Sequence, residues 1–178
     1  KQNAYDADQV VVQKSTTDLA AANKQVADLT ALDQTLPAKL TAAQATATDA
    51  KAKQDAAAKV VDSLDPLVPA LKETVARADA AAQKATGDQE VINALNQIKA
   101  LTGARETTLV AAKKTVTDES ARLAAATQAV AETQKLMADT KNGIVAATQQ
   151  AATYTAALTA AQQKAAASKG VLDQAIAV

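Results

Sequence analysis

Paired carboxylates come closest to a catalytic arrangement in this sequence, at Asp118-Glu119 and at Asp62 with Asp65. Two carboxylates can serve as general acid and general base when an apolar pocket keeps one of them protonated. Both pairs lie in Ala-rich stretches of a chain that has no Phe, no Trp and two Tyr. We therefore expect no pocket that could separate the roles of the two carboxylates.

The residues that most other enzyme mechanisms need are missing. The sequence has no His and no Cys, which excludes His-based triads, thiolate nucleophiles and the usual zinc ligands. Its four isolated glycines cannot form a phosphate-binding loop. We predict a non-catalytic protein with no catalytic, metal-binding or cofactor-binding residues, no cofactor and no small-molecule substrate.

Composition and charge narrow the class of protein further. Of the 178 residues, 48% are hydrophobic but only 1% are aromatic, which suits helices packed on helices through Ala, Leu, Val and Ile. The 19 basic and 19 acidic residues cancel, so we predict no nucleic-acid binding, which needs a basic surface. No apolar run reaches the roughly 18 residues of a membrane span, so we predict no integral membrane segment. An apolar face that is mostly Ala would also anchor only weakly at a membrane surface.

Residues 88–178 carry a seven-residue repeat, the pattern of a coiled coil. One column of the repeat is mostly large and aliphatic, and it comprises Leu95, Thr102, Leu109, Val116, Leu123, Val130, Met137, Ile144, Ala151, Leu158, Ala165 and Leu172. A second column, offset by three or four residues, is smaller or more polar, and it comprises Val91, Ile98, Arg105, Ala112, Glu119, Ala126, Thr133, Thr140, Ala147, Tyr154, Ala161 and Ser168. We call these columns, with the matching stripe in the first half of the chain, the seam.

The first half of the chain has the same spacing in three predicted helical segments. Up to about residue 34 the stripe comprises Tyr5, Val12, Leu19, Ala22, Val26 and Leu29. Up to about residue 62 it comprises Leu36, Leu40, Ala43, Ala47, Ala50, Ala57 and Val61, with Gln54 as a polar interruption. A shorter segment, up to about residue 85, carries Val68, Leu71, Val75, Ala78 and Ala82. Intervals of three, four and seven residues fit a helix and not a strand.

Prolines separate the segments of the first half. We expect a tight turn at Thr35-Leu36-Pro37, because a proline in a helix interior costs about 3 kcal/mol whereas one in the first turn is tolerated. The strongest break lies at residues 63–69, where Asp65 can cap a new helix and Pro66 can be its first residue.

Glycines provide the other predicted interruptions. At Thr86-Gly87-Asp88 we expect a chain reversal, with Gly87 in the left-handed region and Asp88 as the next N-cap. Gly103 predicts a kink or a brief break, because glycine costs about 1 kcal/mol in a helix relative to alanine. Asn142-Gly143 is a turn signal and predicts a further reversal.

These breaks predict an all-α fold with two possible architectures. In the one we prefer, long heptad-patterned helices form an antiparallel up-down bundle, and residues 66–101 form a projecting helical hairpin. In the alternative, the chain is a single long antiparallel coiled-coil hairpin that reverses near Gly87. The unbroken repeat favours the hairpin, whereas the prolines and Asn142-Gly143 favour the bundle. In both, residues 1–178 form one elongated all-helical domain.

Some seam positions hold polar or aromatic residues, namely Gln54, Arg105, Glu119, Thr140, Tyr5 and Tyr154. A buried polar site is one interpretation of the polar residues. We favour the other, that they fix the register of the paired helices or lie where the seam turns outward. For the tyrosines, core filling is favoured over ligand stacking.

The Ala-rich segments 42–47 and 124–131, the Leu36-Pro37-Ala38-Lys39 restart and the Gly87-Asp88 junction resemble helical regions of large bacterial secreted or surface proteins. In particular, the chain resembles the helical spacer of planctomycete multidomain proteins that carry cytochrome c and WD-repeat domains. The haem-attachment and WD signatures are absent, so no site residue is transferred. The resemblance implies a spacer between exported modules and an extracytoplasmic location, periplasmic or at the cell surface. The composition also resembles that of desiccation-protection proteins of the late-embryogenesis type. Those proteins have a repeat of eleven residues, whereas this chain keeps a repeat of seven.

Two hypotheses for function follow. The first is a non-catalytic structural spacer or scaffold module of a larger protein, which holds neighbouring domains apart and can self-associate. The second is a helical adhesion or protein-partner-binding domain that uses the 66–101 hairpin. Its predicted contact residues are Val91, Ile92, Leu95 and Ile98, because apolar residues are denser there than one seam needs. Exposure of Leu95 and Ile98 would favour the second hypothesis.

Overall fold

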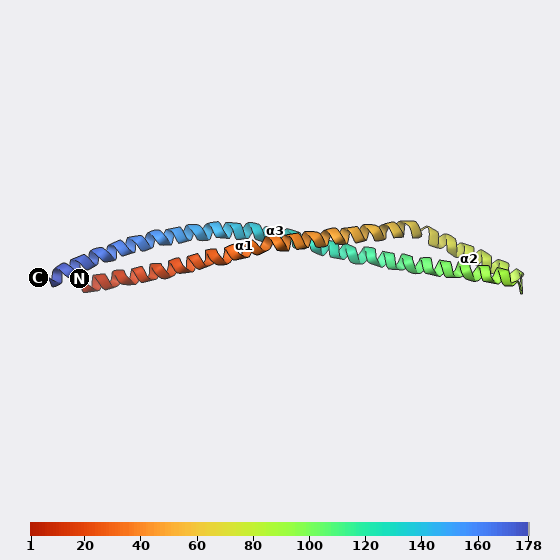
Figure 1. Cartoon of the computed structure of the whole chain (residues 1–178), viewed down its shortest axis with the longest axis horizontal. Helices are drawn as coiled ribbons and strands as arrows, with labels where there is room; N and C mark the ends of the chain where they lie inside the picture. Colours follow the sequence, from red (N-terminus) through yellow and green to blue (C-terminus); the bar gives the residue numbers. More distant parts are fainter. Residues whose placement is uncertain (178) are drawn as a thin grey trace. The chain divides into compact units, whose positions relative to one another are not determined.

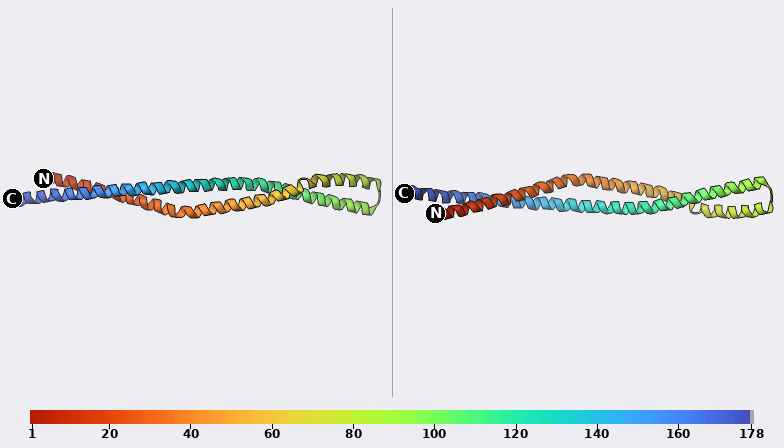
Figure 2. Two further views of the ribbon diagram at one scale, coloured as in Figure 1. Left: turned by 90° about the horizontal axis from the view of Figure 1, so that it is seen from above. Right: turned by 90° about the horizontal axis from the view of Figure 1, so that it is seen from below.

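The computed structural model describes residues 1–177, which are almost entirely helical and include no strand (Figure 1). Helix α1 spans Gln2–Leu64, helix α2 spans Leu67–Lys84 and helix α3 spans Gln89–Ile176. Segments of α1 and α2 lie antiparallel to α3, as the views in Figure 2 show. The prediction of an all-α antiparallel fold is confirmed.

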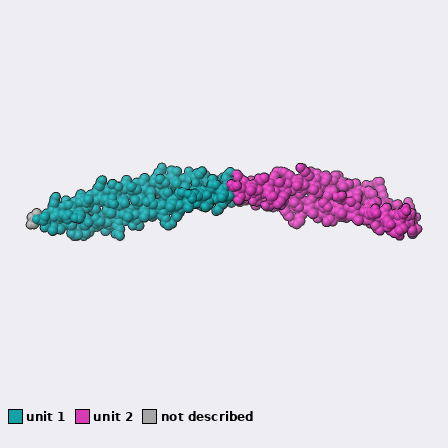
Figure 3. All heavy atoms as spheres, in the orientation of Figure 1, with its two compact units in different colours: residues 1–40, 131–178 teal, residues 41–130 magenta. Residues whose placement is uncertain are grey.

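The chain divides into two compact units (Figure 3). Unit 1 comprises Lys1–Leu40 and Ala131–Val178, and unit 2 comprises Thr41–Val130. In unit 1 the beginning of α1 pairs with the end of α3, so that both ends of the described chain lie at the same end of this unit (Figure 2). In unit 2 the remainder of α1, followed by α2, pairs with the beginning of α3.

The seam predicted for α3 is buried in both units. Every position of the aliphatic column, from Leu95 to Leu172, is buried or partly buried. The second column, from Val91 to Ser168, is also buried or partly buried, and among its described positions only Arg105 is exposed. The seven-residue repeat therefore identifies the packed face of this helix correctly.

The stripe of the first half is buried in the same way, from Tyr5 to Ala82. Leu36 has 0% exposure and is the only large side chain among residues 1–177 that is fully buried. The repeat keeps its phase through the break between α1 and α2, because Leu64 and Val68 are buried four residues apart. Small residues supply much of this face, so the stability of the fold is spread over many modest contributions.

The tight turn predicted at Thr35-Leu36-Pro37 is wrong, because α1 continues through Pro37. Pro37 is exposed, and the preceding Leu36 is the best-buried large residue. A proline in a helix interior costs about 3 kcal/mol. Each buried large aliphatic contributes about 1.5–3 kcal/mol, so the seam on both sides of Pro37 outweighs this local cost.

The kink predicted at Gly103 and the reversal predicted at Asn142-Gly143 are also wrong, because α3 runs through both. Gly143 has a packing role instead of a turn role. A Cβ atom built on Gly143 would lie 3.3 Å from Leu29 Cδ1 of α1, so the missing side chain allows a close approach of the two helices. A Cβ atom at Gly103 would meet nothing within 4 Å. Packing within the chain therefore does not explain Gly103.

The break predicted at residues 63–69 is present, but its cap is not the predicted one. Helix α1 ends at Leu64, and α2 begins at Leu67 after Pro66, which makes no side-chain cap hydrogen bond. The prediction that Asp65 caps α2 is therefore wrong. Its carboxylate oxygen Oδ1 accepts a hydrogen bond from Lys113 Nζ of α3 at 2.5 Å. The ion pair with the neighbouring helix has replaced a local cap.

The reversal predicted at Gly87 is confirmed. Gly87 has a φ of 90°, in the left-handed region that favours glycine. Asp88 caps α3, because its Oδ1 accepts hydrogen bonds from the backbone N–H groups of Glu90 at 3.0 Å and Val91 at 3.2 Å. Residues 66–101 thus form a helical hairpin around this turn, and α3 continues past residue 101 without a break.

The helix boundaries correspond to the hairpin form of the antiparallel fold. The four-helix form requires reversals near residues 35–37 and 142–143, and neither occurs. The chain reverses once among its described residues, at Gly87, between α2 and α3. Continuous burial of the seam decides this outcome over the local breakers.

Candidate functional site

The four residues predicted to contact a partner lie near the beginning of α3. Leu95 is buried at 9% exposure, and Val91, Ile92 and Ile98 are partly buried. Val91, Leu95 and Ile98 belong to the seam, and Ile92 adjoins it. Their density therefore fits packing within the α2–α3 hairpin, and none of the four side chains is fully exposed.

A small apolar cluster holds the α1–α2 break against α3 in unit 2. Leu64 at the end of α1, Val68 at the beginning of α2 and Leu109 of α3 form one buried cluster, with Val61 packed against it. Because the cluster includes residues from both sides of the break, it keeps the two helices on the same face of α3. This explains why the seven-residue repeat continues across Pro66, between α1 and α2.

Ion pairs link α3 to its partner helices along one side of unit 2. Lys72 Nζ lies 2.5 Å from Glu106 Oε1, and Lys99 Nζ lies 2.7 Å from Asp79 Oδ1. In these two pairs each residue directly follows a seam position, and in the Asp65–Lys113 pair Asp65 follows the buried Leu64 and Lys113 follows the seam residue Ala112. Their side chains are all about half exposed, so each pair contributes roughly 0–1 kcal/mol. Their main effect is to favour one pairing of the helices over others.

Unit 1 contains a buried carboxylate, Asp8, which is 5% exposed. Asp8 Oδ2 accepts a hydrogen bond from the Ser168 hydroxyl at 2.6 Å, and Oδ1 lies 3.0 Å from Lys164 Nζ. The hydrogen bond from Ser168 and, after it, the one from Lys164 hold the pKa of Asp8 below its ordinary value. We did not predict this site, although Asp8 lies two heptads before Ala22 and so on the seam.

Unit 2 has a neutral counterpart at Gln54. Its Nε2 donates a hydrogen bond to Ser120 Oγ at 2.7 Å, which joins α1 to α3. This supports the interpretation of Gln54 as a residue that fixes register, because the partly buried amide has a specific partner. The charged seam positions Arg105 and Glu119 behave differently. Arg105 is exposed, and Glu119 pairs with Arg122 of its own helix at 3.3 Å.

A second carboxylate of unit 1, Asp33, is incompletely satisfied. Its Oδ1 is buried and has no hydrogen-bond partner among the described residues. Leu29 lies beside Gly143, so in an antiparallel pair Asp33, one turn further along α1, comes level with the buried Thr140. A buried polar atom without a partner costs about 1–3 kcal/mol. We did not predict this site either, although Asp33 lies seven residues after Val26 on the seam.

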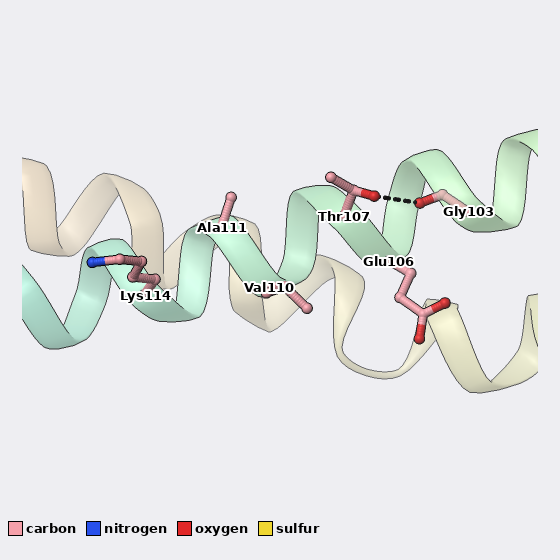
Figure 4. Close-up of a pocket in the computed structure, with 6 residues that line it drawn as sticks. All are labelled: Gly103, Glu106, Thr107, Val110, Ala111 and Lys114. Carbon is pink, nitrogen blue, oxygen red and sulfur yellow. Dashed lines mark hydrogen bonds between the residues drawn. The ribbon is translucent and has the colours of Figure 1, made fainter.

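A shallow hollow lies on the outer face of α3 in unit 2 (Figure 4). It is lined by Gly103, Glu106, Thr107, Val110, Ala111 and Lys114. The Thr107 hydroxyl donates a hydrogen bond to the Gly103 carbonyl at 2.9 Å, and Val110 is 63% exposed. One helix lines the whole hollow, so it lacks the enclosing walls that small-molecule sites usually have.

Two kinds of site are absent from the described part of the chain. Residues 1–177 contain no group of three or more Asp or Glu side chains that could hold a metal ion. Within the same residues, no helix combines the length and the apolar character needed to cross a membrane. Comparisons with protein families, with curated proteins and with solved structures gave no match to this chain.

Proposed function

We propose that the chain is a non-catalytic spacer or scaffold module of a larger protein, which fixes the separation of whatever is joined to its two ends and associates with copies of itself. The observation that carries this proposal is the contact between the two ends of unit 1. Asp8, near the beginning of α1, is bonded to Ser168 and paired with Lys164, near the end of α3.

This contact supports a short and fixed spacing. Paired helices lie with their axes about 8–10 Å apart, so segments that leave unit 1 from the two helices start side by side. The sequence led us to expect a spacer that holds neighbouring domains apart. The geometry of unit 1 instead favours a scaffold that brings the attached segments together. The bacterial and extracytoplasmic setting stays a prediction from the sequence resemblance.

The residues of the alternative hypothesis do not form an exposed patch. A partner-binding domain that used Val91, Ile92, Leu95 and Ile98 would need these side chains on the surface. Leu95 is buried and the other three are partly buried, so their packing gives the hypothesis no support.

Split-reporter fusion tests the scaffold. The two halves of a split fluorescent protein are joined to the two ends, and fluorescence is measured at nanomolar concentration so that reconstitution is intramolecular. The reference is a flexible Gly/Ser linker of the same 178 residues, whose ends are roughly 65–80 Å apart on average. We expect faster reconstitution with the scaffold than with the linker.

Asp8→Lys provides a control variant, because it removes the acceptor for Ser168 and places two like charges together at Lys164. Reconstitution should slow in this variant. Equal rates for the native chain and the flexible linker would contradict the proposed scaffold role.

A further inference from the structure

We propose that the hollow on the outer face of α3 is the surface through which two copies of this chain associate, antiparallel and centred on Val110. This inference rests on the self-association included in the proposed function, and it specifies the surface and the orientation. The partner is a second copy because the two halves of the surface are complementary to each other.

The shape of the surface is self-complementary. Gly103, Thr107 and Ala111 are small residues four apart on α3, and Val110 is 63% exposed beside them (Figure 4). Rows of residues four apart are the ridges that pack into the grooves of a neighbouring helix. A two-fold axis at Val110 makes the Val110 side chains of the two copies face each other, flanked on each helix by the small residues Thr107 and Ala111.

Gly103 supports an approach from outside the chain. Glycine is a poor helix former, and Gly103 lies well inside the 88 residues of α3. A Cβ atom there would meet nothing within 4 Å, so no contact within the chain requires glycine. A helix of a second copy that packs closely on this face would require a small residue at this position.

The charges on the surface are complementary in the antiparallel orientation. Glu106 lies four residues before Val110 and Lys114 lies four residues after it. A two-fold axis at Val110 places Glu106 of each copy opposite Lys114 of the other, which makes two equivalent pairs. Both groups can form further hydrogen bonds. Glu106 accepts one from Lys72 through Oε1 only, and Lys114 donates one to Asp118.

Disulfide trapping tests the surface, because the chain has no natural Cys. In Val110→Cys the two-fold axis brings the two thiols together, so we expect rapid oxidation to a covalent dimer. The six residues that line the hollow are far fewer than the roughly 20–30 per partner of a standard interface. We therefore expect a weak dimer, which trapping at micromolar concentration detects better than equilibrium sedimentation.

Val145→Cys is the matched control. Val145 is 57% exposed on the same helix, and it follows the seam residue Ile144 as Val110 follows Leu109. The residues four before and four after it are Lys141 and Gln149, which are not oppositely charged. Val145→Cys should form dimers no faster than random collision allows. A Val110→Cys rate equal to that of Val145→Cys would overturn the proposal.

A charge swap within Val110→Cys tests the orientation. Glu106→Lys or Lys114→Glu alone replaces two attractive contacts with two repulsive ones, and each should slow trapping roughly fivefold. The double variant restores opposite charges and should restore the rate. If the double variant stays as slow as the single variants, the antiparallel arrangement is refuted.

Circular dichroism checks that each variant remains helical. Slow trapping with normal reporter reconstitution would reject this surface without affecting the scaffold.

Discussion

Alanine substitutions at Gly103 and Gly143 should have different effects, although both residues lie in the interior of α3. In each case alanine replaces a residue that destabilises a helix interior by about 1 kcal/mol. The surroundings of the added methyl group differ. At Gly103 it would meet nothing within 4 Å, and at Gly143 it would lie 3.3 Å from Leu29 Cδ1 and 3.7 Å from Leu29 Cδ2.

These distances set the expected magnitudes. Gly103→Ala should raise the free energy of unfolding by about 0.5–1 kcal/mol, since nothing opposes the gain in helix propensity. Carbon atoms pack best at about 3.5–4.0 Å, so the methyl group at Gly143 must push the end of the Leu29 side chain aside. Overpacking costs about 1–3 kcal/mol, and a flexible side-chain end should keep the cost near the lower limit. The two terms then nearly cancel in Gly143→Ala.

Urea unfolding followed by circular dichroism at 222 nm measures the difference. The chain should be kept at low micromolar concentration, where self-association does not contribute. Leu29→Ala supplies the control background, because it removes the methyl groups that crowd Gly143. In that background Gly143→Ala should recover a gain close to that of Gly103→Ala.

Two results would refute this reasoning. If Gly143→Ala stabilises the native chain as much as Gly103→Ala does, the helices of unit 1 do not approach closely at Gly143. If Gly103→Ala destabilises the chain, α3 is not a regular helix there and the predicted kink would be correct after all.

Three further substitutions test other parts of the seam. Leu36→Ala should lower the free energy of unfolding by about 2–5 kcal/mol, whereas the exposed Leu136→Ala should change it by less than about 1 kcal/mol in the same urea titration. Because the pKa of Asp8 is lowered in the folded chain, its contribution is complete above about pH 4 and is lost as the pH falls through the folded value. Asp8→Asn should therefore show a smaller fall in melting temperature between pH 5 and pH 2. Asp33→Leu should raise the free energy of unfolding by about 1–3 kcal/mol, since it removes an unpartnered polar atom from the seam, and an unchanged urea midpoint would contradict this.

The packed face of each helix could be predicted from the sequence because its signal is repeated many times. Leu95, Leu109 and Leu123 differ in their neighbours but share a position in the repeat, and each is buried or partly buried. The reversal at Gly87 was predictable for a different reason. A glycine followed by a capping aspartate satisfies both the end of one helix and the beginning of the next.

The remaining interruptions could not be judged from local residues. Pro37 and Asn142-Gly143 carry typical signals for a break, yet neither interrupts its helix. Whether a helix tolerates them depends on what the opposite helix offers at that level. Leu36 is fully buried beside Pro37, and Leu29 occupies the space left by Gly143. The contact of Leu29 with Gly143 joins residues that are far apart in the sequence. The effect of Leu36 depends on its burial. Neither can be predicted from the residues around the break alone.

The seam polar residues matter more for register than for stability. A slip of seven residues between two heptad helices moves every seam residue onto an equivalent position, and columns rich in Ala and Leu lose little burial by such a slip. The polar partners do change. A slip that brings Ala161 to the level of Ser168 would deprive the buried Asp8 of its hydroxyl donor. In unit 2 a slip of the same size would separate Gln54 from Ser120. The few polar positions of an Ala-rich seam, together with the ion pairs beside it, therefore favour one register over the others.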